Sequence, residues 1–481
     1  MTGVTRSAVK GGTMSFALEL AKRINAITFN ELPPEAVHCA KVGILDTVGV
    51  TLAGARDDAT RIVAKVSLAE ASAGPSLVFG AGRRVHPLEA ALVNGTASHA
   101  LDFDDCNNTL GGHPSVPILP GLIALAEDIG ASGRNFIAAY VAGFETECKL
   151  SLGVNFHQYT RGWHPTTTIG VFGGAAACAK LMGLPDDRIA VALAIAASLA
   201  AGIKSNFGTM VKPPHVGHCA RSGLFAALLA REGFTANDRA FEHKQGYFNV
   251  FNGPGNYDAA KILPAWADPL DIVSTGIAIK QYPCCGSTHP ALDATLTLAR
   301  EHKIEPEAIE RAEVWIHARR LEHTNRPDPR TALDAKFSLQ YCVARAIADR
   351  RIGIEHFEGN AFDEPAVRHL TARVRAAPYT TGQFPDENHF GAEVRLTLRG
   401  GRTLCARVDE PLGRTAANPL PPERLIEKFE NCAARVLAPG AVSRLQETIQ
   451  RLDAVGDIRD LTALIALPGD PRPVTRRAAR A

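Results

Sequence analysis

The hydrophobic pattern of this 481-residue chain changes its period twice, and this change limits the possible folds more than any other feature. From about residue 15 to residue 231, apolar side chains recur at the three- and four-residue spacing of helices. Near residue 270 the pattern becomes mixed and includes alternating segments, and from about residue 422 to residue 455 it is helical again. The pattern predicts a mainly α-helical protein with a smaller α+β insertion.

Helix start and stop signals place the individual helices. Ser15 is a favourable N-cap, Pro33 marks a helix start, and Gly54 and Gly233 mark helix ends. The most apolar run, 189–203, is rich in alanine and shorter than the roughly 20 residues that span a bilayer. We interpret it as a buried core helix that begins near Asp186. The other predicted helices cover residues 15–25, 34–54, 88–101, 119–129, 135–152, 169–182 and 220–231.

Strand signals appear in the second part of the chain. Residues 313–318 alternate between apolar and polar side chains. Residues 393–398 and 402–408 flank Gly400-Gly401, a strong signal for a β-hairpin. One further helix is predicted between these strands, at about residues 337–348.

These signals predict two domains. A large all-helical domain is expected from both chain ends, residues 1–274 and residues 411–481, with a smaller inserted α+β lid domain from residues 275–410. Residues 471–481 are basic and contain proline, which predicts a frayed tail, and the residues before Met14 are expected to form a second loose tail. No apolar stretch follows the first basic residues, so we predict no secretory signal.

The charge balance and the cysteines narrow the class of protein. Lys+Arg is 52 and Asp+Glu is 50, which argues against a surface that binds nucleic acid. The ten cysteines include no C-x-x-C pair, and the adjacent Cys284 and Cys285 are poorly placed to ligate one zinc ion. Without a secretory signal, we expect reduced thiols in the cytoplasm. We predict no metal, no cofactor, and neither a nucleic-acid nor a membrane partner.

Residues 99–115, HALDFDDCNNTLGGHPS, form the most unusual stretch of the chain. Asp102, Asp104 and Asp105 lie at the end of an apolar helix, where negative charge opposes the helix dipole. Such a cost is tolerated more readily when the residues have a function. The alternative interpretation is a solvated helix end with Asx turns, and the sequence leaves both open.

Three further loops carry imidazole or ammonium groups. His164, in Trp-His-Pro, precedes a helix start whose free N–H groups could hold an anion, although a structural histidine is an equal alternative. Residues 209–221 predict a cation-rich loop that leads into a helix and contains Lys212 and His215. Lys280 lies in an apolar, proline-bounded sequence. Chemistry on polycarboxylates needs this set, because cations neutralise the substrate, a base removes a proton and donors stabilise enolate-like charge.

As a set, these motifs resemble those of the MmgE/PrpD family, which includes 2-methylcitrate dehydratases, cis-aconitate decarboxylases and an iminodisuccinate epimerase. The resemblance runs from about Ser15 to Arg451. In the decarboxylase-like members a threonine follows the acidic run, where this chain has Cys106. The motifs that carry the resemblance are DFDD…HPS (102–115), WHP (163–165), VKPPH (211–215) and KQYPCC…TH (280–289).

The resemblance implies a large helical domain with a smaller α+β lid, a homodimer, and catalysis without a metal or an organic cofactor. By its motifs, the implied active-site residues are Asp102, His113, His164, Lys212 and Lys280. The substrate-binding candidates in the same motifs are Cys106, His215 and Tyr282.

The leading hypothesis is an enzyme that abstracts the proton alpha to a carboxylate of a small polycarboxylic acid, as a 2-methylcitrate dehydratase-like lyase, either a hydro-lyase or a decarboxylase. Lys212 and Lys280 would bind carboxylates, His164 with Asp102 would handle the proton at carbon, and His113 would orient or donate. One alternative is an epimerase of a dicarboxylic amino or imino acid such as iminodisuccinate, which needs the same proton abstraction. Another is a catalytically silent protein that binds polycarboxylates.

Overall fold

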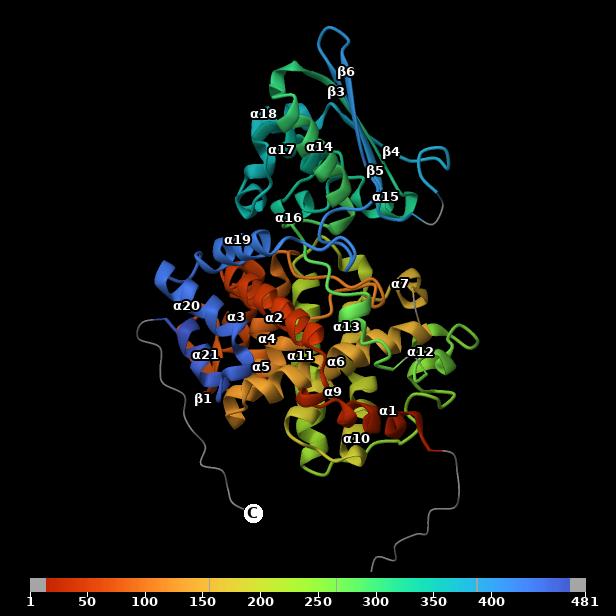
Figure 1. The fold of residues 1–481 in the computed structure, drawn as a ribbon, viewed down its shortest axis with the longest axis vertical. Helices are drawn as coiled ribbons and strands as arrows, with labels where there is room; N and C mark the ends of the chain where they lie inside the picture. The colour runs from red at the N-terminus through yellow and green to blue at the C-terminus, as the bar shows by residue number, and fades with distance from the viewer. Residues whose placement is uncertain (1–13, 155, 265, 386–387, 468–481) are drawn as a thin grey trace, which may run out of the picture.

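The protein is mainly helical, as predicted, in a computed structural model that describes residues 14–154, 156–264, 266–385 and 388–467. The two predicted tails lie outside the described residues. Buried apolar side chains form two large clusters, one drawn from residues 17–279 and 425–465 and the other from residues 282–396. We call the elements around the first cluster the helical unit and those around the second the α+β unit (Figure 1).

The helical unit is the broad lower body in Figure 1, where the C-terminal helices lie beside the first ones of the chain. Its longer helices are α1 (Phe16–Ala26), α2 (Pro34–Gly54), α3 (Asp58–Ser67), α4 (Pro87–Ala100), α5 (Leu119–Ile129), α6 (Gly133–Val154), α9 (Gly170–Leu181), α10 (Asp186–Leu199), α11 (Lys212–Arg231), α19 (Pro422–Ala433), α20 (Pro439–Gln450) and α21 (Ile458–Ile465). Its short elements are α7 (His157–Arg161), α8 (Pro165–Thr168), α12 (Tyr247–Asn252), α13 (Asp271–Ser274) and the antiparallel strands β1 (Ala73–Val78) and β2 (Arg83–Val85).

Most predicted helix boundaries are confirmed to within one or two residues, and the Ser15 side chain caps α1 by accepting from the Leu18 N–H. One of these predictions was wrong. The run 189–203 is not helical throughout, because α10 ends at Leu199 and Ile203 is 46% exposed. Among the described residues, one helix, α2, has the length and hydropathy of a membrane span, and 72% of its most apolar 18-residue window is buried inside the protein.

The loop predicted before residue 220 is also wrong, because α11 already begins at Lys212. Prolines occupy its first turn, where their missing N–H groups need no helical partner. The helix therefore fixes Lys212 at its N-terminus.

Helices α4 and α11 pack closely because glycines face each other. A Cβ on Gly95 would lie 2.8 Å from the Gly217 Cα, and a Cβ on Gly217 would lie 2.3 Å from the Leu92 carbonyl oxygen. This approach sets the end of α4, just before Asp102, close to the start of α11 at Lys212.

The α+β unit carries a four-stranded sheet in the order β4-β3-β5-β6, with β3 and β4 parallel and the other pairs antiparallel. Its elements are α14 (His289–Glu301), β3 (Ile309–Ile316), α15 (Ala318–Thr324), α16 (Ala332–Ala335), α17 (Leu339–Asp349), α18 (Pro365–Thr371), β4 (Val374–Pro378), β5 (Ala392–Leu398) and β6 (Thr403–Val408). The predicted hairpin is confirmed, and Gly400 and Gly401 both take the positive φ angles that the turn needs. A helical domain with an α+β lid remains our proposal for the domain organisation.

Candidate active site

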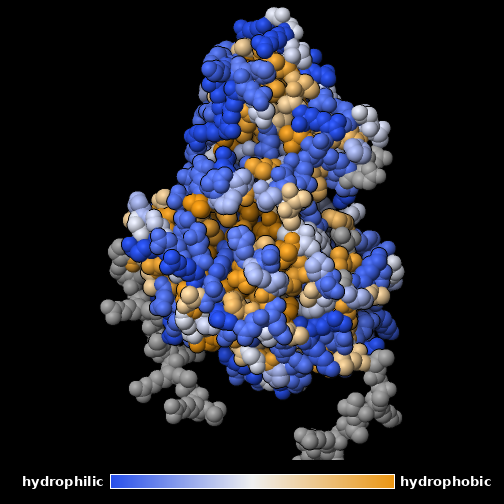
Figure 2. All heavy atoms as spheres, in the orientation of Figure 1, coloured by the Kyte–Doolittle hydropathy of each residue, from blue (hydrophilic) through white to orange (hydrophobic). Residues whose placement is uncertain are grey.

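A cavity of about 410 Å³ lies where the two units meet, with walls from both. Figure 2 shows hydrophobic spheres concentrated where the upper α+β unit meets the helical unit. Six of the eight predicted site residues line this cavity: Asp102, Cys106, His113, His164, Lys212 and Lys280.

Asp102 lies directly after α4 in a left-handed conformation, with φ 52°. Its Oδ1 accepts a hydrogen bond from the Lys212 Nζ at 2.5 Å and lies 3.1 Å from the Lys280 Nζ. Burial alone would raise the pKa of this carboxyl, but the charges of Lys212 and Lys280 outweigh it and hold the pKa well below its usual range. The carboxylate therefore holds two ammonium groups side by side in the cavity wall.

Three buried lysines hold the backbone of this turn in place. The Nζ atoms of Lys336, Lys280 and Lys428 donate to the carbonyl oxygens of Ala100, Asp102 and Phe103, at 3.3, 2.7 and 2.7 Å. Positive charge is favourable at a helix C-terminus. The three ammonium groups therefore offset the unfavourable negative charge of the three aspartates at this end of α4. Lys336 and Lys428 were not predicted, because a lone lysine in a sequence does not indicate its partner.

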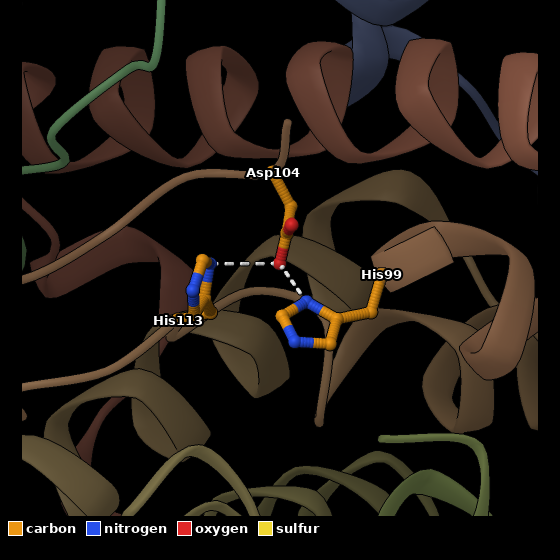
Figure 3. Close-up of side chains that lie close together, drawn as sticks. All are labelled: His99, Asp104 and His113. Carbon is orange, nitrogen blue, oxygen red and sulfur yellow. Dashed lines mark hydrogen bonds and ion pairs between the residues drawn. The ribbon is translucent and has the colours of Figure 1, made fainter. Parts of the chain in front are cut away.

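Asp104 bridges two histidines (Figure 3). Its Oδ2 lies 2.8 Å from the His99 Nδ1 and 2.9 Å from the His113 Nδ1. Burial lowers the pKa of His99 to about 3, so this ring is neutral. Burial would also lower the pKa of His113, but the negative charges of Asp104 and Cys106 raise it to about 10. His113 is thus an imidazolium at neutral pH and can donate a proton.

The same three side chains form a possible metal-ligand set, because one ligand atom from each lies within 4.8 Å of the others. In the structure these atoms already pair with one another, since the Asp104 carboxylate accepts from both Nδ1 positions. A metal ion would have to displace the proton through which His113 binds Asp104. The absence of a metal at this cluster stays a prediction.

His164 is a neutral imidazole. It precedes α8, and its Nδ1 lies 3.3 Å from the His215 Nδ1. Burial, then His99 and Lys212, hold the pKa of His164 well below its usual range. Burial and Lys212 lower the pKa of His215 to about 4. His164 is therefore in the neutral form that accepts a proton. His215 contacts His164 but is not among the residues that line the cavity.

Cys106 lies beside the imidazolium, with its Sγ 3.8 Å from the His113 Nδ1. Two backbone hydrogen bonds of 2.8 Å pair Cys106 with Ala278, two residues before Lys280. Burial would raise the pKa of this thiol, but His113 and Lys280 lower it to about 6. The cavity wall thus contains a thiolate next to an imidazolium.

Tyr282 is not brought into this cavity. Its hydroxyl donates to the Asp293 Oδ1 at 2.6 Å, and Tyr282 lines a second cavity of about 430 Å³. The KQYPCC motif therefore contributes to the first cavity through Lys280 and Cys285. The Cys285 Sγ lies 3.6 Å from the His323 Nε2. Sequence reasoning did not single out the wall provided by the α+β unit, which includes His317, Arg319, Arg320, His323, His389, Phe390 and Arg414.

Comparison with known proteins agrees with the motifs. The model of the MmgE/PrpD N-terminal domain matches residues 18–260, and that of the MmgE/PrpD C-terminal domain matches residues 282–454. Cis-aconitate decarboxylase of Homo sapiens is 30% identical over 468 residues, which cover 95% of this chain and 96% of that protein. Cis-aconitate decarboxylase of Aspergillus terreus is 25% identical over 96% of this chain and 98% of its own length. The family predicted from the sequence motifs is confirmed, and this chain belongs to the MmgE/PrpD family.

Proposed function

We propose that this protein is a lyase that removes carbon dioxide or water from a citrate-like polycarboxylic acid. The main support for the proposal is the positive charge of the residues that line the first cavity. Asp102 is the only carboxylate among the described residues that line it, against the cations Lys212, Lys280, Arg319, Arg320 and Arg414. Such a wall favours a ligand with several negative charges, and a volume of about 410 Å³ is within the usual size for a small-molecule site.

The family and its cis-aconitate decarboxylases identify the chain as an enzyme of the lyase type. Their substrate supports a polycarboxylate substrate for this protein. From the family resemblance alone, we further propose a cytoplasmic homodimer that needs no metal or organic cofactor.

The protonation states in the cavity suit this chemistry. The Lys212 and Lys280 ammonium groups would stabilise the negative charge that develops on the substrate when a proton or carbon dioxide leaves. Neutral His164 would accept the carbon-bound proton in a dehydration. The His113 imidazolium would protonate the leaving hydroxyl, or the carbon that has lost carbon dioxide.

Proton NMR in D₂O tests the proposal. The purified protein is incubated with citrate, 2-methylcitrate, cis-aconitate, tartrate and iminodisuccinate, with the Asp102→Asn variant as a control. A lyase gives a new alkene from one of these acids, or loss of carbon dioxide with deuterium at the carbon that carried it. If one acid binds to the protein but neither product nor exchange appears, the protein has a binding role and the proposal is wrong.

An epimerase is the second candidate, and one observation favours it. His113 is protonated and His164 is neutral, and both rings lie close to that of His99, at centroid distances of 4.6 and 5.7 Å from it. A proton donor and a proton acceptor in one cavity could remove a proton from one face of a carbon and return another to the opposite face. The same NMR experiment distinguishes this activity, because an epimerase returns the same connectivity with inverted configuration and deuterium at that carbon.

A further inference from the structure

Two arginines in the wall of the first cavity have no carboxylate partner. Arg320 comes from α15 and Arg414 from the segment between β6 and α19, and both line the cavity. Among the described residues, no carboxylate oxygen lies within 4.0 Å of either guanidinium, whereas Lys212 and Lys280 share Asp102. Among the residues that the structure describes, the charges of these two guanidinium groups therefore have no carboxylate partner.

The two guanidinium groups are held together by one aromatic ring. The Cζ of Arg320 lies 4.8 Å from the Phe390 ring centroid, and the Cζ of Arg414 lies 4.3 Å from it. The Arg320 Nε donates to the His389 carbonyl oxygen at 3.3 Å, while the Arg414 Nε is buried without a hydrogen-bond partner. Each guanidinium thus keeps N–H donors that have no partner among the described residues.

This arrangement is unfavourable without a bound anion. Like charges in a poorly solvated site repel each other, and burial together with the neighbouring Arg414 lowers the pKa of Arg320 to about 10. A carboxylate between the two guanidinium groups would offset the repulsion and satisfy the free donors, since arginine binds carboxylates through paired N–H groups.

Arg414 also lies close to the proposed reaction site. A Cβ on Gly286 would lie 3.8 Å from the Lys280 Cε and 3.9 Å from the Arg414 Nη1, so both side chains approach the same point of the wall. A small molecule held by Lys212 and Lys280 at one end can therefore reach Arg414 at the other.

We propose that Arg320 and Arg414 bind a second carboxylate of the substrate, remote from the reacting carbon. The enzyme is then restricted to acids that have at least two carboxylates and that bridge the helical and α+β units. This inference rests on the proposed polycarboxylate substrate. It makes Arg320 and Arg414 specificity-determining residues and adds the α+β unit to the binding site.

Substitution of each arginine tests the assignment. Arg320→Gln and Arg414→Gln are compared with Arg395→Gln, a control in the same unit whose guanidinium also stacks on an aromatic ring, 5.0 Å from the Trp315 centroid, but pairs with Glu393 at 3.5 Å. Isothermal titration calorimetry measures the affinity for tricarballylate, a saturated tricarboxylate with no group to eliminate. The Arg320→Gln and Arg414→Gln variants should each lose about 10- to 100-fold in affinity, as for a lost charged hydrogen bond, while Arg395→Gln binds like the wild type.

A double-mutant cycle identifies the partner of the arginines. Replacing one terminal carboxylate of tricarballylate by a carboxamide should weaken binding to the wild type about 10-fold or more, but should cost little further in the Arg414→Gln variant. If the glutamine variants do not fold, Arg320→Lys and Arg414→Lys keep the charge without the planar fork, and their loss should be smaller in the same assay.

The two proposals can fail separately. If wild type turns over none of the acids but tricarballylate binding still depends on both arginines, the lyase proposal is wrong and the carboxylate site stands. If the two glutamine variants bind tricarballylate as tightly as Arg395→Gln, or keep wild-type KM for the acid that is turned over, the arginines do not bind substrate and this inference is wrong.

Discussion

The Asp102 carboxylate accepts a 2.5 Å hydrogen bond from the Lys212 ammonium, and both residues are about 95% buried. The two residues are 110 positions apart and meet because α4 and α11 cross at facing glycines. Lys280 completes the group at 3.1 Å. One buried negative charge thus supports two positive ones, which makes Asp102 the residue on which the arrangement of the cavity depends.

Asp102→Asn should abolish most activity and destabilise the fold. The amide leaves two buried ammonium groups without a counter-charge, and breaking a buried ion pair costs about 3–5 kcal/mol. Activity should fall at least about 100-fold. Steady-state kinetics and thermal unfolding measure both effects. Asp453→Asn, which removes the half-exposed partner of Lys41, is the control and should cost less than about 1 kcal/mol. Equal losses in the two variants would contradict the role of Asp102.

His164→Gln should lower kcat by about 100- to 10,000-fold, because a neutral imidazole that accepts the substrate proton is lost. The exposed His302 provides the matched control, and His302→Gln should keep wild-type rates. Circular dichroism verifies that both variants fold. A folded His164→Gln enzyme with most of its activity would show that another group accepts the proton.

Cys106 should be alkylated at low pH. The thiolate is the reactive form and predominates above the pKa, so the rate of reaction with iodoacetamide should rise up to about pH 7 and then level off, with a midpoint near pH 6. The exposed Cys405 is the internal control, because burial and Glu393 raise the pKa of its thiol and its rate should still rise above pH 8.5. Peptide mass spectrometry follows both sites in one sample. Parallel pH profiles for the two thiols would rule out the pairing of Cys106 with His113.

Activity should survive removal of metal ions, because His99, Asp104 and His113 satisfy one another by hydrogen bonds. The measurement is activity before and after dialysis against a strong chelator, with the metal content determined in parallel. A loss that only an added metal restores would make the three residues a metal site.

Gly217→Ala should destabilise the protein by about 1–3 kcal/mol, the usual cost of overpacking. The added Cβ would lie 2.3 Å from both the Leu92 carbonyl oxygen and the Thr96 Oγ1, which forces α4 and α11 apart. A Cβ on Gly456 meets no atom within 4 Å, so Gly456→Ala is the control. Chemical denaturation gives both free energies of unfolding. Because the two helices carry Asp102 and Lys212, activity should fall in Gly217→Ala as well, and unchanged stability would contradict the close packing.

The sequence determined the local structure of this protein and the chemistry available to it. Helix periodicity, the caps at Ser15 and Pro33, and the Gly400-Gly401 turn are local signals, and the elements that they predict are confirmed nearly residue by residue. The unusual run 99–115 and the motifs around His164, Lys212 and Lys280 pointed to side chains that line one cavity. Local patterns failed where contacts with distant residues determine the structure. The first eight residues of α11, for example, were predicted to be a loop.

Only the tertiary structure decided which groups meet and which carry charge. Arg320 and Arg414 are 94 positions apart and share the Phe390 ring, and Tyr282 pairs with Asp293 rather than facing the cavity its motif partly lines. His113 and His164 are both histidines of HP motifs, yet His113 is protonated because it pairs with Asp104, and His164 is neutral because burial disfavours its charged form. The physical reason is that contacts across the fold and the dielectric environment of a buried group depend on neighbours from distant parts of the chain, and spacing along the sequence does not specify those neighbours.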